Sequence, residues 1–367
     1  MSDSSSMLLI GVGTSGAAIS RGVRRAFGEG LRYLIVDTDA TSGQNGDPFA
    51  LLGGSRLSGR GAGGDVVAAR LAAEDSIQVV DEHLEGVRLA VIVTSLGGGT
   101  GGGATLELTK HLAERGIHSI VFATLPFSFE GENRHHNARG IMLMIEESAN
   151  ATFFLPLDKL IQDVDVMDDA MKRATDTVAS GVTLFWRLVE KPGYLKLDTE
   201  RIRHLLSGAG RGRFAAVTTQ GPDRAASAVD QLIRSELLAT AASPVNAILC
   251  GVLAGEDLRL SEIGTIADGI RGAFGNRLTF DLATVNDEST FSGRLCVVTM
   301  LFEASGHTTA DSSAGGVIGG RPAKRNKGVL GVGPTGRGRF NNAEPTIWNG
   351  EDLDIPTFIR HNINLDF

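Results

Sequence analysis

Short runs of consecutive apolar residues alternate, in the first half of the chain, with stretches whose apolar residues recur every three or four positions. Such runs are typical of strands buried on both faces, and the wider spacing is typical of amphipathic helices. The runs predict strands at 7–12, 31–36, 88–95, 118–125 and 151–155. The spacing predicts helices at 15–27, 104–115 and 134–148. This alternation predicts an α/β fold with a parallel sheet that helices cover on both faces.

A long helical pattern without a strand signal fills the middle of the chain and is broken by Pro192 and Gly193. Beyond it, the patterns predict strands at 213–219, 245–252, 277–284 and 294–303, with helices at 222–238 and 260–274. We therefore expect a nucleotide-binding domain at 7–163, a central helix at 164–191 and a smaller α/β domain at 192–303. A shift to Gly, Ser, Thr and Pro then predicts a disordered linker at 304–350 and a terminal peptide at 351–367.

Charge and cysteine content narrow the class of protein. The net charge of −8 argues against nucleic-acid binding by bulk electrostatics. Cys250 and Cys296 each lie in an apolar strand pattern, which indicates buried thiols in a reducing compartment and no disulfide or metal site. The polar start lacks signal-peptide features, and no apolar stretch reaches the ~18 residues of a membrane-spanning helix. We expect a soluble, cytoplasmic protein without a membrane span.

Three glycine-rich segments lie between the predicted strands and helices, at 11–16, 59–64 and 97–103. The last contains six glycines and Thr100, directly between an apolar strand and an amphipathic helix. Glycine lets the backbone approach a polyanion closely and adopt positive φ. The free N–H groups and the dipole of the following helix favour negative charge. These segments therefore predict phosphate binding.

The first glycine segment by itself points to a different class of protein. Residues 11–16 match the GxGxxG dinucleotide fingerprint, and Asp37 and Asp39 follow at about the ~20-residue distance of a ribose-binding acid. Taken alone, this pattern predicts an NAD(P)-dependent Rossmann enzyme. That class gives no reason for the other two glycine segments, which suit a compact triphosphate held from several sides. The oxidoreductase remains an alternative.

Several motifs, in their order along the chain, resemble the FtsZ/tubulin family of assembling GTPases, and FtsZ more than tubulin. The tubulin signature is matched by Gly-Gly-Gly-Thr-Gly-Gly-Gly at 97–103. Short FtsZ-like sequence motifs follow at 37–40, 61–64, 126–131 and 191–193. The similarity covers about residues 7–303. It implies a tubulin/FtsZ-like fold with a Rossmann-type GTP-binding domain, and GTP or GDP as the ligand. Mg²⁺ would be held mainly by phosphates and water.

The same resemblance assigns the nucleotide contacts. Glu130 matches the ribose-binding glutamate, Arg134 the basic residue near phosphates and sugar, and Asp176 the carboxylate that accepts hydrogen bonds from guanine. Three positions depart from FtsZ: Ala18 and Leu157 each replace a usual Asn, and Met171 replaces a frequent Phe near the base. The expected nucleotide-binding residues are Gly13, Thr14, Ser15, Gly16, Ala17, Ala18, Asp39, Ala62, Gly63, Gly64, Gly97, Gly98, Gly99, Thr100, Gly101, Gly102, Glu130, Arg134, Met171 and Asp176.

The loop after the central helix carries the most important departure from FtsZ. In that family the loop enters the nucleotide site of the next subunit, reads N-x-D-x-x-D, and supplies carboxylates that activate water. Here Lys196 and Arg201 replace the first Asn and the last Asp, and Asp198 is kept. A guanidinium has no acceptor and cannot serve as a base. β-Tubulin also carries a basic residue there, and the GTP it faces is not hydrolysed. We expect slow or impaired hydrolysis, with Asp198 and the neighbouring Glu200 as the candidate catalytic acids.

The resemblance also implies partners. A head-to-tail contact that does not close generates filaments, so we expect a cytoskeletal homopolymer, or co-assembly with a true FtsZ in cell division. Residues 352–360 resemble the C-terminal peptide through which FtsZ binds adaptors. Its expected contact residues are Asp354, Ile355, Pro356, Phe358 and Ile359, and an adaptor would recruit the protein to the membrane. A GTP-binding regulator that does not polymerise is the second alternative.

Overall fold

A computed structural model describes most of the 367-residue chain. The described residues are 6–28, 30–44, 46–160, 166–191, 193–197, 199–206, 209–239, 245–275, 278–304, 347–348 and 351–352. The chain divides into two units, 1–310 and 311–367. In the second unit, β11 (Ile347–Trp348) pairs antiparallel with β12 (Glu351–Asp352). The predicted adaptor residues, from Asp354 to Ile359, lie outside the described residues.

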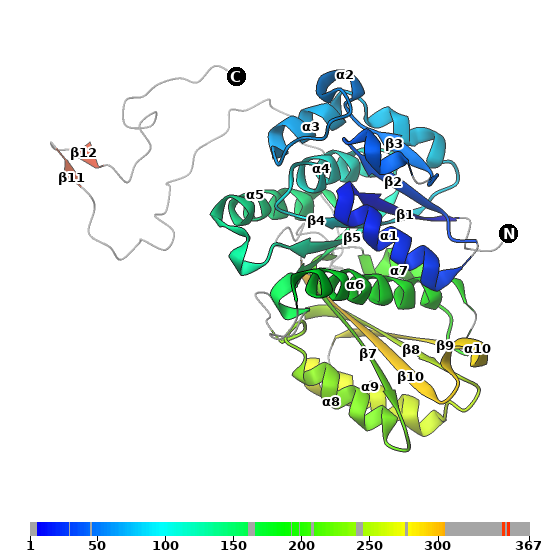
Figure 1. The fold of residues 1–367 in the computed structure, drawn as a ribbon. Coiled ribbons are helices and arrows are strands. Elements are labelled where there is room, and N and C mark those ends of the chain that lie inside the picture. Colours follow the sequence, from blue (N-terminus) through cyan, green and yellow to red (C-terminus); the bar gives the residue numbers. More distant parts are fainter. Residues whose placement is uncertain are drawn as a thin grey trace, which may run out of the picture. The chain divides into compact units, whose positions relative to one another are not determined.

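One ten-stranded sheet runs through the first unit, in the order β3-β2-β1-β4-β5-β6-β7-β10-β8-β9 (Figure 1). Its strands are β1 (Met7–Val12), β2 (Tyr33–Asp37), β3 (Phe49–Leu51), β4 (Leu89–Ser95), β5 (His118–Leu125), β6 (Ala151–Pro156), β7 (Ala209–Gln220), β8 (Val245–Ala254), β9 (Thr279–Asn286) and β10 (Arg294–Ala304). β10 runs antiparallel to both of its neighbours, and the other pairs are parallel. The predicted α/β fold with a mainly parallel sheet is confirmed.

Helices cover both faces of this sheet, because successive strand residues point to opposite sides. Met7 and Leu9 of β1 pack in one core with α1 and α6, whereas Leu8 and Ile10 pack in a second core with α3, α4 and α5. The main helices are α1 (Gly13–Phe27), α3 (Val66–Glu74), α4 (Gly99–Glu114), α5 (Glu132–Ser148), α6 (Met167–Glu190), α7 (Thr199–Leu206), α8 (Arg224–Arg234) and α9 (Leu260–Phe274). The short helices are α2 (Gly54–Leu57), α10 (Glu288–Phe291) and the 3-10 turns η2 (Ala40–Gly43), η3 (Ile77–His83), η4 (Ser128–Glu130) and η5 (Leu157–Lys159).

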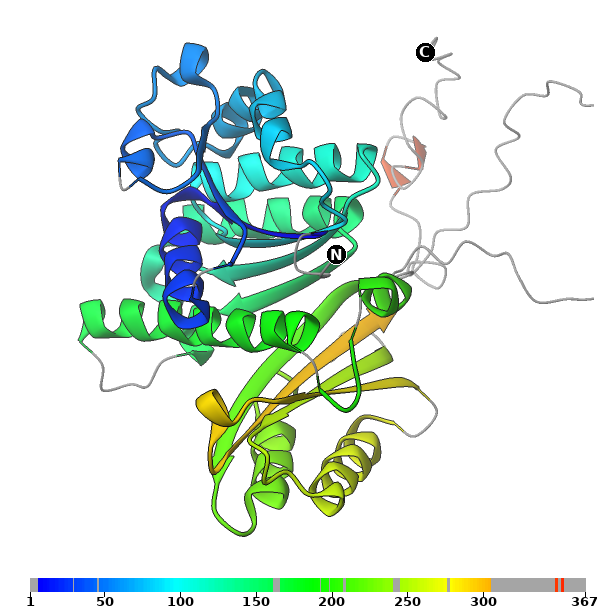
Figure 2. The ribbon, with the colours of Figure 1, turned by 90° about the vertical axis from the view of Figure 1, so that its right-hand side faces the viewer.

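The long helix α6 packs beside α1 and extends across the sheet (Figure 2). Their contacts follow the same order along both helices: Gly22 faces Ala179, and further along, Arg187 donates to the carbonyl oxygen of Ala26 at 3.1 Å. In the part of the sheet made by β7 to β10, α6 covers one face and α8 and α9 cover the other. The amino end of α6 therefore lies nearer the start of α1 than the carboxyl end of α6 does.

Element boundaries differ from the sequence prediction mainly at glycine. α4 begins at Gly99, five residues before the predicted start at Ala104. Its glycines are poor helix formers, but close packing requires them. A Cβ on Gly103 would lie 2.4 Å from the carbonyl oxygen of Val66. The strand β3 was not predicted. Both cysteines are buried as expected, and no described helix is long and apolar enough to cross a membrane.

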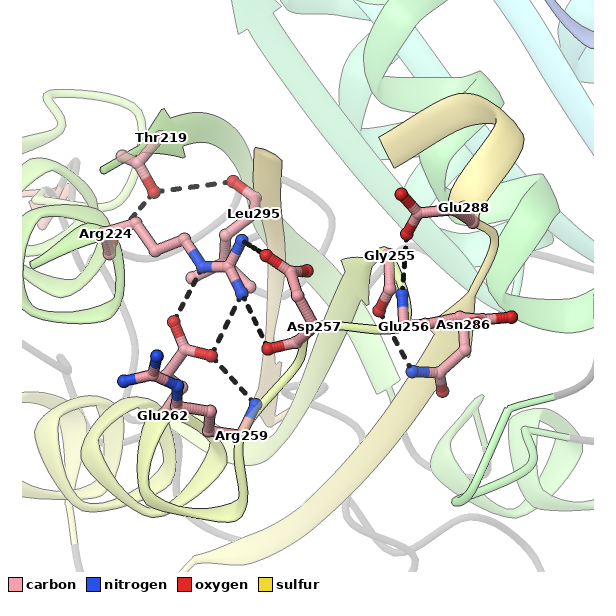
Figure 3. Close-up of polar contacts among 10 residues, drawn as sticks. All are labelled: Thr219, Arg224, Gly255, Glu256, Asp257, Arg259, Glu262, Asn286, Glu288 and Leu295. Carbon is pink, nitrogen blue, oxygen red and sulfur yellow. Dashed lines mark hydrogen bonds and ion pairs between the residues drawn. The ribbon is translucent and has the colours of Figure 1, made fainter. Parts of the chain in front are cut away.

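A charged cluster at the starts of α8 and α9 was also not predicted (Figure 3). Arg224 donates from Nε to Glu262 at 2.7 Å and from Nη1 to Asp257 at 2.8 Å, and its side chain is only 6% exposed. The hydrogen bond to Glu262 raises the pKa of Arg224, and the same bond lowers the pKa of Glu262. We interpret the cluster as a link that fixes α8 against α9, since the Arg224 guanidinium binds both carboxylates.

Candidate functional site

Two helix starts meet at the carboxyl ends of β1 and β4. α1 begins at Gly13 directly after β1, and α4 begins at Gly99 after a three-residue loop that follows β4. A Cβ on Gly13, whose φ is +72°, would lie 3.4 Å from the backbone nitrogen of Gly101. Neither helix has a side-chain hydrogen bond at its N-cap or an acidic residue in its first turn. Two sets of backbone N–H groups and two positive dipole ends therefore converge, as an anion site requires.

Glycine is required here by space as well as by conformation. A Cβ on Gly101 would lie 2.1 Å from the carbonyl oxygen of Ser95, and a Cβ on Gly16 would lie 2.4 Å from that of Val93. Both distances are far shorter than a non-bonded contact allows. The first turns of α1 and α4 thus lie directly on the end of β4, which holds their N–H groups in fixed positions.

Two threonines hold these helix starts together, and neither was among the predicted site residues. The hydroxyl of Thr94, fully buried at the end of β4, lies 3.0 Å from the carbonyl oxygen of Gly101 and 3.3 Å from that of Val12. The hydroxyl of Thr38 lies 2.7 Å from that of Thr100. Thr38 follows β2, so three neighbouring strand ends contribute to one site. A polar residue at the end of an otherwise apolar run was the available signal for Thr94.

The segment at 59–64 closes the site from another side. The backbone nitrogen of Gly61 donates to the carbonyl oxygen of Thr38 at 3.1 Å. A Cβ on Gly99 would lie 2.9 Å from the Cβ of Ala62. Gly63 and Gly64 both have positive φ and open space around the missing Cβ. All three glycine-rich segments predicted from the sequence therefore lie together at the carboxyl ends of the strands.

Asp37 and Asp39, the acidic residues of the dinucleotide alternative, accept hydrogen bonds from their own loop. Asp37 is 2% exposed and accepts hydrogen bonds from the backbone nitrogen of Thr38 at 2.8 Å and from the Ser42 hydroxyl at 2.6 Å. Asp39 accepts from the hydroxyl of Thr41 at 2.7 Å and from its backbone nitrogen at 2.9 Å. The Thr41 hydroxyl, then its N–H, lower the pKa of Asp39. Neither carboxylate is arranged chiefly to bind a ribose.

Glu130 and Arg134 form a pair beside the third glycine segment. One oxygen of Glu130 accepts from the backbone nitrogen of Phe127 at 2.8 Å, and the other accepts from Arg134 Nη1. A Cβ on Gly97 would lie 3.3 Å from the Cβ of Arg134, so the arginine lies next to the glycine loop. The Arg134 side chain is 59% exposed, which leaves its guanidinium accessible to an anion.

The residues expected around the base are separate from this network. Met171 and Asp176 are exposed on the first half of α6, and within the described residues the Asp176 carboxylate forms no hydrogen bond or ion pair. The same stretch of α6 reaches the site through Ala174, which packs with Phe127 and Leu157. Thr14, Ser15 and Ala18 are exposed on α1, whereas Ala17 is buried; Gly98 and Gly102 belong to the start of α4.

The predicted catalytic loop lies at the opposite end of the strands from the glycine segments. Asp198 is outside the described residues. Glu200, on α7, accepts from Arg203 Nη2 at 2.6 Å and lies 3.9 Å from Arg88, which precedes β4. Because Arg88 is at the amino end of β4 and the glycine loops are at its carboxyl end, the chain does not bring Glu200 to the glycine loops.

Comparisons with known proteins agree with this geometry. Residues 7–165 match the family model described as Tubulin/FtsZ family, GTPase domain. A tryptophan-to-tyrosine mutant of FtsZ from M. jannaschii superimposes with a TM-score of 0.76 at 22% identity, over 81% of this chain and 91% of that chain. An empty FtsZ dimer from the same organism gives 0.75 at 22% identity, over 84% and 95%. A GTPγS-bound protofilament of CetZ2 from Haloferax volcanii gives 0.70 at 21% identity, over 82% and 93%.

At these identities the structural matches establish the fold. The sequence match covers the domain that builds the three glycine loops and the Glu130–Arg134 pair. Residues 7–165 therefore match the GTPase domain of the Tubulin/FtsZ family, and the chain shares its fold with FtsZ and CetZ.

Proposed function

We propose that this protein binds GTP at the three glycine loops and assembles head to tail into cytoskeletal filaments that hydrolyse GTP slowly. Gly13, Thr100 and Gly101 would hold the phosphates, Glu130 and Arg134 would lie at the ribose, and Asp176 would select guanine. Mg²⁺ would be bound by phosphate oxygens and water, which fits a site where Asp37 and Asp39 accept hydrogen bonds from their own loop.

The position of the loop after α6 carries this proposal. α6 has 24 residues and is therefore about 36 Å long. Its first half packs against Phe127, whose neighbour Pro126 lies beside Gly97, and the loop at 193–197 follows its far end. A chain cannot bring this loop to its own nucleotide, whereas the next copy along an axis parallel to α6 can. Such a contact joins two different surfaces, so it does not close and builds a filament.

Exposed apolar side chains at both ends support a contact between copies. Tyr194 and Leu195, in the loop, are 76% and 42% exposed. At the glycine-loop edge, Phe129 is 62% exposed and stacks on Phe127, with ring centroids 5.0 Å apart. Aromatic residues are enriched in the buried centres of protein interfaces. The solved relatives include an FtsZ dimer and a CetZ2 protofilament.

The charges of the loop favour GTP retention over hydrolysis. Lys196 would bring positive charge to the neighbouring nucleotide, which stabilises phosphate. Neither Lys196 nor Arg201, which replaces the FtsZ acid, provides a base. Glu200, the nearest acid on α7, is held by Arg203. Because Arg203 occupies this carboxylate, we assign water activation mainly to Asp198.

Assembly and hydrolysis are separated by following light scattering after a limited dose of GTP with Mg²⁺. We expect a rise that persists after the dose, because filaments that hydrolyse slowly do not release their subunits. GDP is the control and should give no rise. A rise followed by prompt decay would contradict impaired hydrolysis. No difference between GTP and GDP would contradict self-assembly and favour a GTP-binding regulator that does not polymerise.

Replacing Thr100 with valine should weaken GTP binding at least about tenfold in calorimetry. The change removes the hydroxyl that contacts Thr38 and would contact phosphate, and hydrogen bonds to charged groups contribute about 1.5–3 kcal/mol. Thr105→Val is the matched control, because the Thr105 hydroxyl is buried in α4 without a partner among the described residues. Equal affinities of the two variants would count against the assigned phosphate contact.

The C-terminal peptide is the remaining part of the proposal. Residues 354–359 combine Ile355, Phe358 and Ile359 with the turn-forming Asp354 and Pro356. We propose that this segment docks on an adaptor, folding as it binds. The adaptor would bring the protein to the membrane and to its place in cell division. Deleting residues 351–367 should leave GTP-driven scattering unchanged and abolish adaptor binding.

A further inference from the structure

The loop after α6 is bound along the edge strand of the sheet. β9 is the last strand in the sheet order, so one of its sides has no strand neighbour. The backbone nitrogen of Thr284 donates to the carbonyl oxygen of Leu195 at 2.8 Å. The backbone nitrogen of Leu195 donates in turn to the Thr284 hydroxyl at 3.0 Å. Gly193 lies so close that a Cβ there would be 1.7 Å from the carbonyl oxygen of Thr284.

A charged contact continues this attachment into α7. Arg201 forms an ion pair through Nη2 with Asp281, three residues before Thr284 on β9. Its Nη1 donates to the carbonyl oxygen of Lys196 at 2.8 Å. The Asp281 side chain is 19% exposed and that of Arg201 is 41% exposed, so the pair is partly shielded from water. Arg201 thus ties the loop, the start of α7 and β9 together.

We propose that Asp281 is a positioning residue that fixes Arg201, and with it the loop at 193–197 and the start of α7, on the sheet formed by β7 to β10. This inference rests on the proposed function insofar as it assigns the loop a role at the neighbouring nucleotide. The arginine at the position of the FtsZ acid is then one half of a pair. Restoring the acid with Arg201→Asp alone places a carboxylate opposite Asp281. Two like charges that face each other repel, which would displace the loop.

Amide hydrogen exchange measured by mass spectrometry on the full chain with GDP tests the pair without requiring assembly. Asp281→Asn should speed exchange in the loop peptide about fivefold, since a partly exposed ion pair contributes about 1 kcal/mol. Arg201→Asp should speed it further, and the charge swap Arg201→Asp with Asp281→Arg should restore protection. Asp268→Asn, an equal charge change on the exposed face of α9, is the control and should leave the loop unchanged.

GTP turnover supplies a readout that a merely structural role would not produce. Arg201→Asp with Asp281→Asn should turn over GTP about tenfold faster than Arg201→Asp alone, because only the first leaves the new acid in an ordered loop. Unchanged exchange in Asp281→Asn, or a charge swap that restores no protection, would overturn the proposal. So would equal turnover by these two variants when both are active. If no variant assembles or hydrolyses GTP, the proposed function fails, and the exchange data alone then decide on Asp281.

Discussion

Replacing Gly101 with alanine is expected to weaken GTP binding at least about a hundredfold, or about 2.7 kcal/mol. The new Cβ would lie 2.1 Å from the carbonyl oxygen of Ser95 and 3.1 Å from the Thr94 hydroxyl. The start of α4 must therefore move away from the end of β4. This movement breaks the contact between the Thr94 hydroxyl and the carbonyl oxygen of Gly101, and it misdirects the N–H groups that would hold phosphate. Isothermal titration calorimetry on the folded variant measures the loss.

The control for this change is Gly140→Ala. Gly140 lies inside α5, and a Cβ there would meet no atom within 4 Å. Alanine is a better helix former than glycine, so this variant should be more stable by about 0.5–1 kcal/mol, with unchanged GTP affinity. Near wild-type affinity in Gly101→Ala would show that the backbone at the start of α4 does not hold the nucleotide.

Burial made most of the fold predictable from the sequence. Strands covered on both faces must be apolar throughout, and for this reason β1, β4 and β5 could be located from continuous apolar runs. The start of α4 was wrong because helix propensity is a local property. The glycines at the start of that helix are selected by atoms of β4 and α3 that are distant in sequence.

The residues of the candidate site likewise divide into those that a local sequence signal predicts and those that it does not. The glycine loops could be predicted because close approach to phosphate demands glycine at a strand end, which is visible in any single segment. Met171 and Asp176 followed only from the family resemblance, since an exposed residue on a helix carries no local signal. The contact between Arg201 and Asp281 joins residues 80 positions apart. Nothing in either neighbourhood indicates the other, so charge pairs of this kind require the structure.

Gly193→Ala is expected to detach the loop from β9 and to destabilise the protein by about 3 kcal/mol, at the upper end of what overpacking costs. A Cβ at this position would lie 1.7 Å from the carbonyl oxygen and 2.4 Å from the carbonyl carbon of Thr284. Both are backbone atoms of a strand that cannot move without breaking its pairing with β8. The loop must move instead, and the two hydrogen bonds between Leu195 and Thr284 are lost. Urea unfolding measures the change in stability.

Two further variants make the Gly193 result interpretable. Thr284→Val removes only the hydroxyl that accepts from Leu195, so it should cost about 1 kcal/mol and leave the loop close to β9. Gly272→Ala, in α9 with no atom within 4 Å of its Cβ, should not destabilise the protein. If the loop forms the contact with the next subunit, GTP-driven light scattering should fall most in Gly193→Ala, less in Thr284→Val and not at all in Gly272→Ala. Full assembly by Gly193→Ala, despite its lower stability, would mean that the filament does not require an ordered loop. The detached loop would then still occupy the interface.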